Sequence, residues 1–137
     1  MTTTITQIRT GLASALGNIS GLRTSPIVPD SPNPPMGWVE PQTVNYDLSF
    51  GRGLDEFDFD LTILVQRTND VRTAQNKLDL YCSSSGAQSV KRAIELDRTL
   101  GGLVQDCRVT GLSSYGQATY GETTYLAAVF AVKVYSN

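Results

Sequence analysis

Two carboxylates in the middle of the chain have the spacing of an acid–base pair. Asp58 and Asp60 are two positions apart in a segment where polar and apolar residues alternate. On a strand their Cα atoms would lie roughly 6.6 Å apart, within the range of the paired carboxylates of glycosidases. Such pairs are common on strands, and nothing basic or histidine-like is close in sequence to tune them. Catalysis, a solvated strand face, and an acidic lining or subunit contact therefore all stay open.

The rest of the composition argues against enzyme chemistry. The chain has no histidine, so it lacks the commonest general base, the usual zinc ligand and any histidine-activated nucleophile. Cys82 and Cys107 follow no metal-ligand spacing and are predicted to be buried free thiols. Gly51-Arg52-Gly53 lacks the lysine and the following helix of a phosphate-binding loop. We expect a protein without catalytic residues, metal or cofactor.

Length and charge indicate one folded domain, residues 1–137, with no field that attracts nucleic acid. A single core suits 137 residues, and a net charge of −2 does not neutralise phosphates. No apolar run reaches the roughly 20 residues of a membrane helix, and the start lacks the pattern of a signal peptide, which favours a protein kept in the cytoplasm. Six of the 13 acidic residues cluster at Glu40, Asp47, Asp55, Glu56, Asp58 and Asp60.

All six prolines lie between Pro26 and Pro41. Proline fixes its own φ, donates no N–H and pushes the preceding residue into extended conformations. Residues 26–41 are therefore predicted to form an extended, proline-rich arm, with short strands expected at 22–28 and 37–40. An arm stiffened by proline loses less entropy when it docks on a neighbour. The candidate contacts are Pro32, Pro34, Pro35 and Trp38, of which Trp38 either anchors the arm to the core or meets a partner.

Hydrophobic periodicity predicts three helices. The first runs from about Thr4 to Asn18, with a threonine as N-cap. The second follows Asn69 or Asp70, and the third ends at Gly101-Gly102. Their expected core positions are Ile5, Ile8, Leu12, Leu16 and Ile19, then Val71, Ala74, Leu78 and Tyr81, then Val90, Ala93, Ile94 and Leu96.

Alternation of apolar and polar residues predicts two antiparallel strand pairs. Segments 43–50 and 56–67 are joined by a glycine-bearing loop. Segments 103–112 and 124–135 are separated by a loop rich in glycine, tyrosine and threonine that holds Tyr115, Tyr120 and Tyr125. The expected fold class is α+β: a largely antiparallel or mixed sheet of about four to five strands, an N-terminal helix and two central helices packed on one face, and the proline-rich arm.

Three features suggest contacts outside the chain. The last strand is apolar on both faces, so the face with Tyr125, Ala127 and Val129 needs cover from the arm, the curl of the sheet or another subunit. The tip of the first strand pair has the composition of an interface, with Phe50, Arg52 and Leu54 as candidate contacts. The acidic strand predicts a lumen or solvent face made by Asp55, Glu56, Asp58 and Asp60.

The order of these segments resembles the tail terminator proteins of long-tailed bacteriophages (siphoviruses), also called tail completion or minor tail protein U-like proteins. The resemblance covers nearly the whole chain, although no single segment is a diagnostic motif. The segments that carry it are Ile8–Leu12 through Gly21-Leu22-Arg23, Val28–Pro35, Tyr46–Glu56, Ala74–Asp79 and Cys107–Gly111.

The resemblance implies a structural virion protein rather than an enzyme. Tail terminators form a hexameric ring on the head-proximal end of the tail tube, stop polymerisation of the major tail tube protein and present a surface to the head–tail connector. The implied partners are thus other copies of this chain, the tube protein and the connector or head-closure protein, with DNA passing through unbound and no membrane contact. The remaining alternatives are another neck protein, such as a head–tail joining or adaptor protein, and a small hydrolase that uses paired carboxylates.

Overall fold

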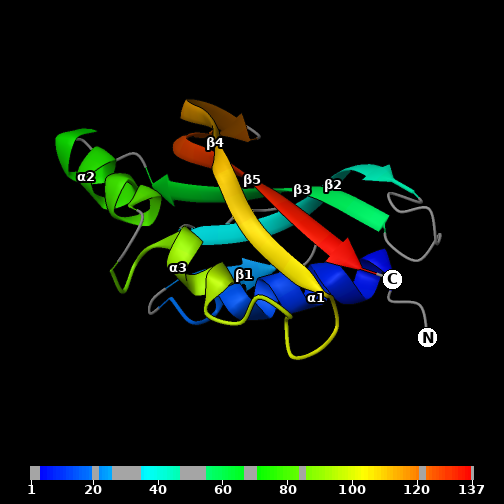
Figure 1. Cartoon of the computed structure of the whole chain (residues 1–137). Coiled ribbons are helices and arrows are strands. Elements are labelled where there is room, and N and C mark those ends of the chain that lie inside the picture. The colour runs from blue at the N-terminus through cyan, green and yellow to red at the C-terminus, as the bar shows by residue number, and fades with distance from the viewer. Residues whose placement is uncertain are drawn as a thin grey trace.

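The chain folds into a five-stranded mixed sheet and three helices, an α+β arrangement (Figure 1). The computed structural model describes residues 4–19, 22–25, 35–46, 55–66, 71–83, 86–120 and 123–136. The strand order is β1-β2-β3-β5-β4, in which β1 pairs parallel to β2 and the other pairs are antiparallel. The elements in chain order are α1 (Ile5–Leu16), β1 (Arg23–Ser25), β2 (Met36–Asn45), β3 (Asp55–Gln66), α2 (Val71–Cys82), α3 (Val90–Glu95), β4 (Asp106–Tyr120) and β5 (Thr123–Ser136).

Helix α1 begins and ends with local signals that the sequence contains. Thr4 is the N-cap: its hydroxyl accepts a hydrogen bond from the backbone N–H of Gln7, and the Gln7 side chain accepts one from the N–H of Thr4. This capping box satisfies two N–H groups that the first turn leaves without partners. The helix ends at Leu16, followed by Gly17 as C-cap. The prediction of a helix from about Thr4 to Asn18 is confirmed within two residues at the C-terminal end.

Strand β2 corrects two predictions. The sequence suggested separate strands at 37–40 and 43–50, and an arm extending to Pro41. The structure has one strand, Met36–Asn45, that contains Pro41, with a register shift between Pro41 and Thr43. Proline is tolerated in strands at edges and bulges, and beyond Trp38 the described part of β2 pairs only with β3. Residues 36–41 therefore belong to the sheet, and residues 26–34 lie outside the described part of the chain.

The main core lies on the side of the sheet reached by odd-numbered β3 side chains. Phe57, Phe59, Leu61, Ile63 and Val65 are buried there, as the alternation predicted. The same cluster contains buried residues of all three helices. Helix α1 contacts β1, β2 and α3, helix α2 contacts β3 and β5, and helix α3 contacts β4. The helical members are Ile8, Leu12, Ala13, Leu16, Ala74, Leu78, Tyr81, Val90, Ala93 and Ile94.

The third helix is shorter than predicted. It ends at Glu95, so the expected stop at Gly101-Gly102 is wrong, and Leu96 is 55% exposed instead of buried. The Asp97 carboxylate accepts hydrogen bonds from the N–H groups of Thr99 and Gly101. These bonds offer the backbone an alternative to another helical turn. Leu100, Gly101 and Gly102 then all have positive φ, which reverses the chain toward β4.

Strands β4 and β5 form one long hairpin that replaces a predicted loop. Tyr115 and Tyr120 were expected between strands, but both lie in β4, and only residues 121–122 separate β4 from β5. Tyr125 lies in β5, within the predicted strand 124–135. Two register shifts mark extra residues on β4 at Thr110 and Ser113. Their hydroxyls donate to the carbonyl oxygens of β5 residues 131 and 129, so side chains replace ladder bonds at the bulges.

Candidate interaction surface

The face of the sheet turned away from the main core combines an acidic part with an apolar part. We call it the second face. Along each strand, successive side chains point to opposite faces of the sheet, and the second face carries those that point away from the main core. Its central members are Trp38, Glu40 and Thr43 from β2, Glu56, Asp58, Asp60 and Leu64 from β3, and Tyr125, Ala127, Val129, Ala131 and Lys133 from β5.

The acidic part of the second face contains a base from another strand. The Lys133 ammonium on β5 lies 2.6 Å from Glu56 Oε1 and 3.1 Å from Asp58 Oδ1. Asp58 Oδ2 also accepts a hydrogen bond of 2.7 Å from the Thr43 hydroxyl on β2. The sequence showed no base near these carboxylates, because Lys133 becomes their neighbour only through the β3–β5 pairing.

Asp58 and Asp60 have opposite electrostatic environments. The hydrogen bond from Thr43 and the contact with Lys133 lower the pKa of Asp58, although burial opposes them. Burial raises the pKa of Asp60, and the charges of Glu40 and Asp58 raise it further. Glu40 lies directly opposite Asp60 in the β2–β3 register. Like charges placed opposite each other on neighbouring strands destabilise a sheet.

We expect the two carboxylates to affect stability with opposite signs. Asp58→Asn should lower the free energy of unfolding at pH 7 by about 1 kcal/mol, because it weakens charge-assisted hydrogen bonds. Asp60→Asn should raise it by up to about 1 kcal/mol, because it removes a like-charge pair. Urea unfolding followed by circular dichroism measures both effects.

The pH dependence of this pair follows from the same two shifts. The folded pKa of Asp58 is lowered, so its contribution is complete above the ordinary value of 3.8 and is lost as pH falls through the folded pKa. The folded pKa of Asp60 is raised, so its ionised carboxylate lowers the free energy of unfolding. This destabilisation is complete above the folded pKa and disappears as pH falls toward 3.8. The gain from Asp60→Asn should therefore vanish near pH 4. Equal losses in both variants at pH 7 would contradict this assignment.

Asp55 does not join the acidic face. It precedes Glu56 on β3, so the pleat places it on the side of Phe57 and the main core. The predicted lumen or solvent face therefore keeps Glu56, Asp58 and Asp60. Asp58 and Asp60 line a surface cavity of about 330 Å³ between β2 and β5. Its lining residues are Gln42, Thr43, Asp58, Phe59, Asp60, Thr110, Ala131, Val132 and Lys133.

The apolar part of the second face has a small core of its own. Trp38, Leu64 and Ala127 are buried there, and Met36, Ala118 and Tyr125 pack against them. The Trp38 indole N–H donates to Glu40 Oε1 at 2.8 Å. Leu64, which interrupts the polar alternation of β3, thus belongs to this second cluster. Val129 and Ala131 continue the apolar strip along β5 and are only half-buried.

The candidate contacts of the proline-rich arm and the hairpin tip are only partly described. Pro32, Pro34, Phe50, Arg52 and Leu54 lie outside the described residues. Pro35 is half-buried, and its carbonyl oxygen accepts a hydrogen bond from the N–H of Arg23 on β1. Trp38 has no exposed surface. Its position agrees with an anchor in the core of the chain.

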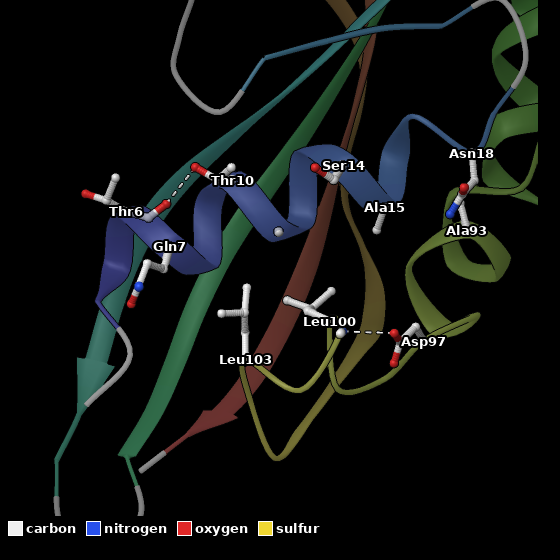
Figure 2. A pocket seen from close by; sticks show the side chains of 12 residues that line it. Thr6, Gln7, Thr10, Ser14, Ala15, Asn18, Ala93, Asp97, Leu100 and Leu103 are labelled. Carbon is white, nitrogen blue, oxygen red and sulfur yellow. Dashed lines mark hydrogen bonds between the residues drawn. The ribbon is translucent and has the colours of Figure 1, made fainter. Parts of the chain in front are cut away.

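A groove of about 540 Å³ separates α1 from the turn that follows α3 (Figure 2). Leu100 and Leu103 point from this turn toward α1. Gly11 allows their close approach, because a Cβ at that position would lie 3.2 Å from the Leu103 side chain. The α1 wall is polar but uncharged, with Thr6, Gln7, Thr10, Ser14 and Asn18. The opposite wall carries one carboxylate, Asp97, which accepts hydrogen bonds from the backbone N–H groups of Thr99 and Gly101. Among the residues that line the groove, Asp97 is the only ionisable one.

The two thiols are poor nucleophiles. Cys107 is fully buried in β4, where burial raises its thiol pKa to about 12. Cys82 ends α2 and is half-buried, and burial raises its pKa to about 11. Both side chains therefore stay protonated at neutral pH, whereas the thiolate is the reactive form. In the described ranges, no three residues of the metal-ligating types lie close enough together to hold an ion.

Two charged residues matter here that the sequence reasoning missed. Lys133 was the only charged residue in the predicted last strand, a signal that it would meet the acidic strand if the two paired. Glu95 was read only as part of a helix. Its carboxylate accepts a hydrogen bond from the backbone N–H of Val109 on β4, and no sequence pattern indicates this contact.

No protein-family model and no curated protein matches this chain. Among the described helices, none is long and apolar enough to cross a membrane.

Proposed function

We propose that this chain is a structural protein of a long-tailed bacteriophage that closes into a ring, of six copies, at the head-proximal end of the tail tube. The ring ends polymerisation of the tube protein and presents a surface to the head–tail connector, while DNA passes through without specific binding. The protein has no enzymatic role. It acts in the virion tail after assembly in the host cytoplasm.

The observation that carries this proposal is the incomplete cover of the second face along β5. Tyr125, Val129 and Ala131 form an apolar strip that is only half-buried within one chain. Apolar strips next to polar groups are typical of protein–protein contacts. A head-to-tail contact of this kind closes into a ring when the rotation between copies permits it.

The acidic part of the second face supports a role around DNA. Glu40 and Asp60 lie opposite each other, and no described basic side chain forms an ion pair with either. Repeated around a ring, such pairs would give a negative wall that repels phosphates. A wall of this sign suits a channel that DNA must cross without binding.

In the proposed ring, each subunit meets its neighbour through the second face and the proline-rich segment. The three helices cover the main-core face of the sheet, which leaves the second face for a neighbour. The proline-rich segment 26–34 extends as an arm onto the adjacent copy, where its restricted backbone reduces the entropy lost on docking. The arm and the β5 strip together form the joint.

The direct functional test is control of tube length. Tail tube protein that polymerises in vitro should form tubes without a defined length. Adding this protein should stop growth at one end and reduce the mean tube length at least several-fold. Electron microscopy of the tubes measures both effects. A deletion of residues 31–34, which keeps the Pro35 carbonyl that accepts from the Arg23 N–H, should remain folded but lose most of this activity. If the intact protein neither binds tube ends nor changes their length, another neck position replaces the terminator assignment.

A further inference from the structure

Strand β4 is the last strand of the sheet, and in the described part of the chain it pairs with β5 alone (Figure 1). An edge strand presents a row of unpaired N–H and C=O groups, which is a template for another strand. Folded proteins usually protect such edges with charges, proline, bulges or covering side chains. The two halves of β4 differ in this protection.

The first half of β4 is protected. The Glu95 carboxylate accepts a hydrogen bond of 3.1 Å from the Val109 N–H. Bulges at Thr110 and Ser113 break the regular register, and bulges twist an edge away from incoming strands. Arg98 and Asp106 form a two-bonded ion pair beside the beginning of the strand.

Within residues 114–120, the second half of β4 has no charge, no proline and no bulge. Residues Ser114–Tyr120 pair without interruption with Thr123–Val129 of β5. Ser114, Tyr115, Gln117 and Thr119 are exposed. The Tyr115 hydroxyl donates to Asp79 Oδ1 on α2 at 2.6 Å. This bond ties the hairpin to the body of the protein, so the edge is held in place before any partner binds.

We propose that this half-strand binds a second copy of itself. Ser114–Tyr120 of one copy pairs antiparallel with the same residues of the other about a two-fold axis at Gln117. This axis lies at the middle of the seven residues between the Ser113 bulge and the end of β4. In that register Tyr115 meets Thr119, Gly116 meets Ala118, and Gln117 meets Gln117.

The chemistry of the half-strand favours a second copy over a different partner. A two-fold contact requires a surface that complements itself. Aromatic residues pair well with β-branched residues across strands, and the absence of charge avoids repulsion between identical residues. The pairing uses the outer edge of β4, not the β5 strip of the proposed ring, and it does not depend on that proposal. Seven paired residues make a small interface, so the dimer is weak and depends on concentration.

Sedimentation equilibrium over a concentration series tests this pairing with charge-swap variants. The wild-type protein should show a monomer–dimer equilibrium. Gln117→Lys alone and Gln117→Glu alone should each weaken dimerisation at least tenfold, because like charges meet at the axis. An equimolar mixture of the two variants should restore it. Asn76→Lys, at an exposed position of α2, is the matched control and should dimerise like the wild type.

Three outcomes would overturn the pairing. The first is a wild-type protein that stays monomeric at millimolar concentration. The second is a self-association that neither Gln117 variant weakens, including a closed ring of six that forms equally in all of them. The third is a mixture of the Lys and Glu variants that fails to regain the wild-type affinity. The second outcome would leave the proposed ring intact, so the two proposals fail separately.

Discussion

Trp38→Ala is expected to lower the free energy of unfolding by about 3–5 kcal/mol. The side chain has no exposed surface and packs with Leu64 and Ala127 on the second face. Its removal leaves a cavity between β2, β3 and β5. It also deprives the Glu40 carboxylate of its indole donor, next to Asp60. Urea unfolding of the purified monomer measures the loss.

Trp38→Phe is the matched variant for this prediction. Phenylalanine keeps most of the apolar volume but cannot donate to Glu40, so the expected loss is about 1–2 kcal/mol. The comparison separates packing from the hydrogen bond. If Trp38→Ala left the monomer as stable as the wild type while preventing assembly, Trp38 would be a partner contact rather than a core anchor.

Val129→Lys is expected to leave the monomer folded and to abolish ring formation. Val129 is half-buried on the second face, between Thr62 of β3 and Ser114 of β4 in the sheet register. A lysine stem can lie along this apolar strip while its ammonium reaches water. In a subunit joint the same ammonium would be buried without a partner, at a cost of several kcal/mol. Tube-capping activity should fall at least a hundredfold.

The control for Val129→Lys is the same new charge on another element. Asn76→Lys adds a lysine at an exposed position of α2 and should keep full capping activity. Near-wild-type circular dichroism of both variants would show that the fold survives. Full tube capping by Val129→Lys would remove the β5 strip from the joint.

The elements that the sequence predicted well depend on local signals. Helix α1 has a capping threonine and apolar residues at helical spacing, and β3 has an uninterrupted apolar alternation. Both patterns can be recognised within about a dozen consecutive residues, because neither the helix cap nor the alternation along a strand depends on contacts with distant residues. Helix α2 was found in the same way, through Ala74, Leu78 and Tyr81.

The errors concern features that distant residues decide. Residues 113–120 contain two tyrosines and a glycine, and the sequence predicts a loop there, but pairing with β5 makes them part of a strand. The sequence placed Pro41 in an arm, whereas the bulge accommodates it in the sheet, at a point where the described part of the chain pairs β2 with β3 alone. The acidic strand was located correctly, but the effect of Lys133 on Asp58 depends on the β3–β5 register. Glu95 reaches Val109 only because α3 lies against β4.

Cryo-electron microscopy of assembled tails tests the proposed ring in its place of action. We expect one closed ring of this protein, with six copies, at the head-proximal end of the tube. In that ring the β5 strip with Val129 should be buried between neighbouring copies, and Glu40 and Asp60 should face the channel. Tails that lack this protein at that end, or that carry it as anything other than a single closed ring, would contradict the proposed role as the ring that ends the tube.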